Sequence, residues 1–219
     1  MNENIIVKLE KEGTVTTTFR KLDPDKKARL YRTALNAFSL SVFDRVSFDS
    51  IAEGAEVSKG SLFQYFGNKE NLLRFVSEIY LDDYSRYWQE YVSNEHAVRA
   101  RDRLTDFFSA QYDFWQESRR EFAFYLKMLY ENDRVLTSAF ADRIRQIQTT
   151  YLAGIIMRGS ETGEIRRDIE SSRMAPVLLA VMEGIYYQLT PEQFNPKKKN
   201  QIEELINSAL SSLIDGIRG

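Results

Sequence analysis

Cysteine is absent from this chain of 219 residues, and histidine occurs once, at His96. The lack of cysteine excludes disulfides, thiolate nucleophiles and thiolate metal sites. A single imidazole argues against a His-rich metal centre or a Ser–His triad. Gly154, Gly159 and Gly163 do not follow a predicted strand, so no phosphate-binding loop is indicated. We therefore predict that the chain is not an enzyme and holds no metal or cofactor, and that a reducing cytoplasm is its natural setting.

Long apolar runs are also absent. No run approaches the roughly 18 residues that a membrane span needs, so no membrane segment is predicted. The opening residues lack a continuous apolar core and a small-residue cleavage site, so no secretory signal is expected.

Excess positive charge is missing as well. The formal net charge is −2, and residues 23–80 hold eight Lys or Arg against eight Asp or Glu. A nucleic-acid binder with this balance must use individually placed charges rather than a broadly basic surface.

Proline and glycine are scarce, with four and ten copies, and charged residues alternate with apolar ones at spacings of three and four. This pattern predicts an all-α protein of about nine amphipathic helices. Asp23, Ser47, Ser58 and Asn68 are suitable N-caps for the first four. We expect those four helices at about 24–41, 48–55, 59–66 and 69–92. Five more are expected at about 97–117, 120–131, 134–159, 171–189 and 201–217.

The first 22 residues have a different pattern, in which IIVKLE and TVTTTF alternate on either side of KEG. The alternation suggests a two-stranded hairpin, which is marginally stable by itself. A flexible arm is the alternative. The predicted organisation is thus an arm or hairpin at 1–22, a domain of three helices and the start of a linking helix at 23–84, and a second helical domain at 85–219.

Residues 48–65 have the spacing of a helix-turn-helix. Ile51 and Leu62 are expected to fill the shared core, small Ala52 allows the two helices to approach, and Val57 fills the corner between them. The second helix would then present its polar side chains outward, where they can donate hydrogen bonds to base edges or phosphates. These side chains are Lys59, Ser61, Gln64 and Tyr65.

Two lysines follow the helix caps at Ser58 and Asn68. Lys59 and Lys69 therefore begin helices, where the helix dipole disfavours a cation. A phosphate placed between the two would compensate, because capped helix starts and lysines both attract anions. The alternative is that both are ordinary surface residues.

At this point the sequence resembles the TetR family of bacterial transcriptional regulators. The resemblance rests on SFDSIAEGAEVSKGSLFQYFGNKENLLRFV, residues 47–76, and extends back through ARLYRTALNAFSLSVF. It implies a dimer that binds a near-palindromic double-stranded DNA operator, most often as a repressor, and responds to a small molecule.

The resemblance also implies which residues contact DNA. Lys59, Ser61 and Gln64 would read bases, while Ser47, Tyr65 and Lys69 would contact phosphates. Gly60 would allow close backbone approach, and Phe63 would touch a thymine methyl or a sugar, or turn into the core. Two positions depart from the family pattern, because Val42 and Glu56 stand where glycine is usual. Both side chains tolerate a left-handed backbone poorly, so the turns are expected to differ or to be strained.

The second domain is rich in aromatic residues along two neighbouring helices. They suit a pocket for an apolar or flat effector, although aromatic residues at helical spacing are more often simple core. The candidate pocket residues are Phe107, Phe108, Gln111, Tyr112, Trp115, Tyr125 and Arg145. The last two helices would supply a dimer interface through Val177, Leu178, Val181, Ile185, Ile206, Leu210 and Leu213. The rival interpretation is a helical ligand-binding dimer that does not bind DNA.

Overall fold

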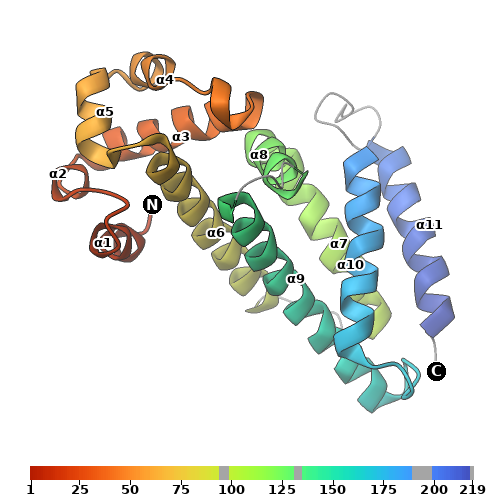
Figure 1. Cartoon of the computed structure of the whole chain (residues 1–219). Helices are drawn as coiled ribbons and strands as arrows, with labels where there is room; N and C mark the ends of the chain where they lie inside the picture. The colour runs from red at the N-terminus through yellow and green to blue at the C-terminus, as the bar shows by residue number, and fades with distance from the viewer. Residues whose placement is uncertain (94–98, 131–134, 189–198, 218–219) are drawn as a thin grey trace. The chain divides into compact units, whose positions relative to one another are not determined.

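The computed structural model describes residues 1–93, 99–130, 135–188 and 199–217. Within them the chain is all-helical, as predicted (Figure 1). Each of the nine expected helices is present. They are α3 (Pro24–Leu40), α4 (Phe48–Ala55), α5 (Lys59–Phe66), α6 (Lys69–Ser93), α7 (Ala100–Glu117), α8 (Arg119–Tyr130), α9 (Val135–Thr162), α10 (Ser171–Gln188) and α11 (Lys199–Ile217). A short 3-10 helix, η1 (Phe43–Arg45), joins α3 to α4.

The first 22 residues form two further helices, α1 (Glu3–Lys11) and α2 (Thr17–Arg20), so the hairpin prediction is wrong. Asn2 and Thr16 cap their N-termini with side-chain oxygens. Ile6 and Leu9, three residues apart on α1, are fully buried. Burial at helical spacing, together with two good caps, outweighs the strand-like alternation that suggested a hairpin.

The contacts divide the chain into two compact units, Met1–Ser93 with Ala123–Phe140, and Asn94–Phe122 with Ala141–Gly219. This division differs from a boundary at residue 84, because the later part of α8 and the start of α9 pack on α6. The ring of Tyr80 lies 5.7 Å from that of Phe124 and 5.3 Å from that of Phe140.

The first unit has an aromatic core to which α2 contributes its centre. The Phe19 ring lies 4.9 Å from Phe66 on α5 and 5.0 Å from Phe75 on α6. Figure 1 shows α1 and α2 beside α5 and α6, in agreement with the contacts of α1 with α6 and of α2 with α5. The N-terminal segment, residues 1–22, is therefore part of this first unit, which we call the head.

The second unit contains α7, most of α9, α10 and α11. The rings of Phe107 on α7 and Tyr151 on α9 stack at 5.2 Å. The Arg145 guanidinium donates to both carboxylate oxygens of Glu183, at 3.1 and 3.2 Å, which joins α9 to α10. No helix among the described residues is long and apolar enough to cross a membrane.

The predicted dimer residues on α10 and α11 divide into two groups. Leu178 and Leu210 are buried within the second unit, so their assignment to an interface is wrong. Val177 and Val181 are 49% and 37% exposed and lie one turn apart on α10. Ile185 and Leu213 are half-buried, and the side chain of Ile206 lies outside the described residues.

Candidate nucleic-acid interface

The helix-turn-helix is formed by α4, a turn at 56–58, and α5. Ile51, Ala52 and Leu62 are buried between the helices, as predicted. The amide of Val57 donates to the Ala52 carbonyl at 3.0 Å, which closes the end of α4. The chain therefore turns sharply and α5 begins at a fixed place.

Side-chain caps begin all three helices of this region, as the sequence predicts. Ser47 Oγ accepts from the Asp49 amide at 3.1 Å, and Ser58 Oγ accepts from the Ser61 amide at 3.0 Å. Asn68 Oδ1 accepts from the Asn71 amide at 2.8 Å. Each cap satisfies one of the amides that a helix start leaves without an internal partner.

Most of the predicted DNA-contacting residues are accessible. Ser47, Lys59, Gly60 and Gln64 are exposed and Ser61 is half-buried. A Cβ placed on Gly60 would meet only the Ser58 hydroxyl, at 3.8 Å, so packing does not require glycine there. We use the name recognition face for the set Ser47, Lys59, Gly60, Ser61, Phe63 and Gln64.

Phe63 is also on the outside, with 49% of its surface exposed. Its ring lies 4.8 Å from that of Phe48 on α4, which holds it against the helix-turn-helix without covering it. Of the two alternatives left open for Phe63, the outward position is the one observed.

Tyr65 does not point outward, so that prediction is wrong. Its side chain is 8% exposed, and its ring lies 6.0 Å from that of Phe19. The reason is the N-terminal segment, because α2 covers this side of α5 and brings Phe19 against it. Neither the arm nor the hairpin expected for residues 1–22 placed a helix over position 65.

The two lysines differ in their surroundings. Lys59 Nζ lies 2.8 Å from Asp49 Oδ2, with both side chains more than half exposed, so a phosphate can replace this weak pair. Lys69 Nζ donates to the carbonyls of Asp44 and Val46, at 3.3 and 3.0 Å. It also lies 4.6 Å from the centre of the Phe43 ring. Lys69 therefore joins η1 to the start of α6, a structural role that the sequence did not indicate.

Glu56 adopts the left-handed conformation expected of the glycine it replaces, with φ 55° and ψ 45°. Arg29 of α3 stabilises this turn, since its Nε donates to the Ala55 carbonyl at 2.9 Å and its Nη1 lies 3.2 Å from Glu56 Oε2. Val42 instead has φ −58° and ψ 145°, an ordinary backbone conformation. Of these two positions, only Glu56 has a strained backbone.

Close contact between α3 and α4 depends on Gly54. A Cβ at this position would lie 2.9 Å from Thr33 Cγ2, and the Thr33 hydroxyl donates to the Gly54 carbonyl at 3.2 Å. Sequence reasoning missed Arg29, Thr33 and Gly54. A glycine inside the helical pattern of α4 was the available signal.

The predicted effector residues are mostly core. Phe107, Phe108, Gln111, Tyr112 and Tyr125 are at most 1% exposed. Tyr125 belongs to the first unit, Arg145 forms the ion pair with Glu183, and the Trp115 side chain lies outside the described residues. Two glutamines, Gln111 on α7 and Gln148 on α9, are completely buried near the stacked pair of Phe107 and Tyr151. They place polar side chains inside the core of the second unit.

A groove of about 230 Å³ is present elsewhere in the second unit, and none of the predicted effector residues lines it. Its lining residues are Ala100, Arg103, Ile155, Arg158, Gly159, Glu161, Thr162 and Glu164. Glu164 Oε2 accepts from the Ala100 amide at 2.9 Å, so this carboxylate caps the start of α7.

Comparison with known proteins gives a family match within the first unit. Residues 30–76 match the family model described as bacterial regulatory proteins, tetR family. This match runs from α3 through the helix-turn-helix into α6. A comparison with curated proteins finds no match.

Solved structures match over most of the chain. A TetR family transcriptional regulator from Chloroflexus aurantiacus is 22% identical, with a TM-score of 0.72, over 94% of this chain and 99% of that one. FadR from Bacillus subtilis in complex with stearoyl-CoA is 17% identical, with a TM-score of 0.71, over 88% and 100%. The ketosteroid regulator KstR2 of Mycobacterium tuberculosis is 19% identical, with a TM-score of 0.61, over 91% and 97%. These likenesses establish the fold of both units.

The strained turn at Glu56 yields a stability prediction. Replacing Glu56 with Gly or Val removes the same exposed ion pair, but only glycine accepts φ 55° without strain. We expect Glu56→Val to lower the free energy of unfolding by about 1–3 kcal/mol relative to Glu56→Gly. Urea denaturation measures the difference, and equal stability of the two variants would show that the turn stores no strain.

Proposed function

We propose, on the basis that this chain is a DNA-binding transcriptional regulator of the TetR family, that it acts as a ligand-responsive repressor and binds a near-palindromic operator as a homodimer. The family match to the helix-turn-helix supports DNA binding. The accessible recognition face carries the proposal further, because it joins two capped helices to exposed groups that can contact bases and phosphates.

Lys59, Ser61 and Gln64 are proposed to read bases, since their polar groups lie along the accessible side of α5. Ser47 is proposed to contact phosphate at the start of α4. Lys69 is proposed to contact phosphate as well. Its ammonium has three donors, so it can hold the carbonyls of η1 and a phosphate together. Tyr65, which the resemblance assigned to phosphate, is left out of the proposed contacts because its side chain is buried.

A homodimer would place two recognition faces in successive major grooves, roughly 34–36 Å apart. The dimer face that we propose consists of Val177 and Val181 on α10 with Leu205 on α11, which is 48% exposed. Ala180 and Gly184, between and beside the two valines, are exposed as well. A helix surface of small and apolar residues without charge suits close packing against its own copy.

The effector is proposed to be a largely apolar small molecule held in the second unit. The buried aromatic residues of α7 support an apolar ligand, and Gln111 is the proposed polar anchor. The relative whose structure contains stearoyl-CoA supports the same class of ligand. Ligand binding would repack this core and change the separation of the heads. A coupling of about 1–3 kcal/mol is sufficient to change occupancy several-fold.

The first prediction concerns DNA binding. Lys59→Ala is expected to weaken binding to an operator selected from a random duplex library by about 1–3 kcal/mol. Arg86→Ala is the control, since it also removes one positive charge. Arg86 lies about 25 Å along α6 from Lys69, at a rise of about 1.5 Å per residue. Fluorescence anisotropy at a stated salt concentration measures both. Equal losses would mean that overall charge, rather than the recognition face, governs binding.

The second prediction concerns assembly. Val181→Asp is expected to convert the dimer to monomer at micromolar concentration, because it buries an unpaired carboxylate in the interface. Leu40→Asp is the matched control, since Leu40 is 73% exposed on α3. Sedimentation velocity distinguishes the two states. A dimer that persists in Val181→Asp would place the interface elsewhere.

The third prediction concerns the effector. Stearoyl-CoA is expected to release the selected operator, with an affinity loss of about 5- to 150-fold, whereas free CoA, which lacks the acyl chain, is expected to have no effect. A ketosteroid serves as a second apolar probe. Release by free CoA with no response to either apolar probe would contradict an apolar effector.

A further inference from the structure

The recognition helix α5 has only eight residues, so the unpaired groups at its ends are a large share of its backbone amides and carbonyls. Its last four carbonyls, at residues 63–66, have no partner within the helix. Two of them are satisfied by the chain that follows. The Gly67 amide donates to the Phe63 carbonyl at 2.8 Å, and Asn71 Nδ2 donates to the Phe66 carbonyl at 2.8 Å.

The other two carbonyls are satisfied by one distant residue, Thr16. Its hydroxyl donates to the Gln64 carbonyl at 3.0 Å, and its amide donates to the Tyr65 carbonyl at 3.0 Å. These are hydrogen bonds from the N-terminal segment, 48 residues away in the sequence. All four terminal carbonyls of α5 therefore have donors.

Thr16 is itself held in place by the fold. It is the N-cap of α2, and its Oγ1 accepts from the Phe19 amide at 3.4 Å. Phe19 is fully buried among the rings of α5 and α6. The donor groups of Thr16 are thus fixed relative to the aromatic core of the head.

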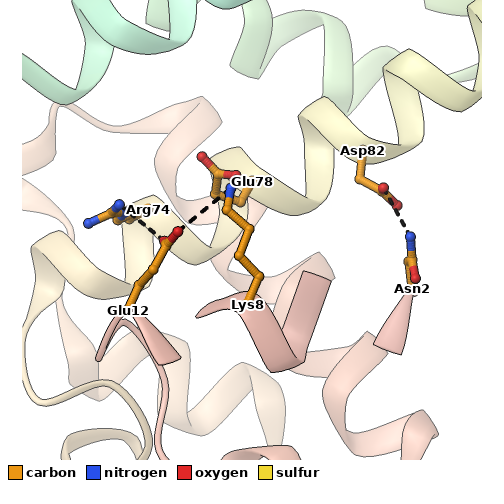
Figure 2. Close-up of polar contacts among 6 residues, drawn as sticks. All are labelled: Asn2, Lys8, Glu12, Arg74, Glu78 and Asp82. Carbon is orange, nitrogen blue, oxygen red and sulfur yellow. Dashed lines mark hydrogen bonds and ion pairs between the residues drawn. The ribbon is translucent and has the colours of Figure 1, made fainter. Parts of the chain in front are cut away.

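The preceding helix, α1, is fastened along α6, as Figure 2 shows. Buried Ile6 and Leu9 supply the apolar contact, and polar pairs join α1 to three positions of α6 that are one turn apart. The pairs are Asn2 with Asp82 (3.1 Å), Lys8 with Glu78 (2.9 Å) and Glu12 with Arg74 (3.2 Å). These contacts with α6 hold the segment that ends at Thr16 in place.

We propose that Thr16 is a positioning residue for operator recognition, which holds the last turn of α5 through the carbonyls of Gln64 and Tyr65. Gln64 is exposed at this turn and is one of the proposed base-reading residues. Without the hydroxyl of Thr16 the last turn of α5 would fray. The backbone of Gln64, from which the base-reading side chain extends, would then no longer be held in one position. This role rests on the proposed function, because it concerns the discrimination of one duplex from another.

The experiment compares three variants of the full chain. Thr16→Val removes the hydroxyl and keeps the branched shape, while Thr16→Ser keeps the hydroxyl. Thr17→Val is the matched control. The Thr17 hydroxyl donates to Glu10 Oε1 at 2.5 Å, within the N-terminal segment, and lowers the pKa of that carboxyl.

Affinities for the selected operator and for a random duplex are measured by anisotropy. Thr16→Val removes the hydrogen bond to the Gln64 carbonyl together with the longer one from the Phe19 amide, and is expected to bind the operator about three- to ten-fold more weakly. Its affinity for random DNA is expected to stay unchanged, so the specificity ratio falls. Thr16→Ser and Thr17→Val are expected to bind within about two-fold of the original chain.

Amide hydrogen exchange without DNA tests the cap separately from the function. Amides of residues 63–66 are expected to exchange about three- to ten-fold faster in Thr16→Val than in Thr17→Val. Unchanged exchange, or equal losses of affinity in Thr16→Val and Thr17→Val, would overturn the proposal. An unaltered chain that binds no duplex, with exchange as expected, would overturn the proposed function and leave the cap intact.

Discussion

The head depends on hydrogen bonds to the unpaired backbone amides and carbonyls at the two ends of α5, a two-turn helix that must remain accessible. A helix of eight residues has little internal hydrogen bonding of its own, and α5 cannot be buried without losing its recognition face. Its support therefore comes from both ends and from one side. Ser58 caps its N-terminus, Asn71 and Thr16 donate to carbonyls of its last turn, and Phe19 packs against its buried side. The outward side of α5 stays accessible.

The need to support α5 from its ends and one side explains why so small a domain contains so many residues that fix the position of a neighbouring element. The turn before α5 adopts a left-handed conformation at Glu56, and Arg29 stabilises it from α3. Gly54 allows α3 and α4 to approach closely, and Lys69 holds η1 to the beginning of α6. None of these contacts increases net positive charge. They place a few polar groups accurately, which is how a head with a balanced charge can still bind a polyanion.

Much of the fold followed from local sequence patterns, because caps and apolar spacing act over a few residues. Ser47, Ser58 and Asn68 marked helix starts correctly, and Ile51 and Leu62 marked the shared core. The failures concern contacts between distant segments. Residues 1–22 alternated like strands, yet Phe19 is buried against Phe66 and Phe75, which no local pattern reveals. The burial of Tyr65 and the two roles of Thr16 follow from the same contact.

We propose that a few placed cations, rather than a broadly basic surface, bind DNA. The slope of log affinity against log salt concentration tests this most directly. Lys59 and Lys69 from two subunits bring four cations to the duplex, so the operator complex should have a slope no steeper than about −4. A much steeper slope, as a broadly basic surface would give, or no binding to any duplex at low salt, would contradict the claim.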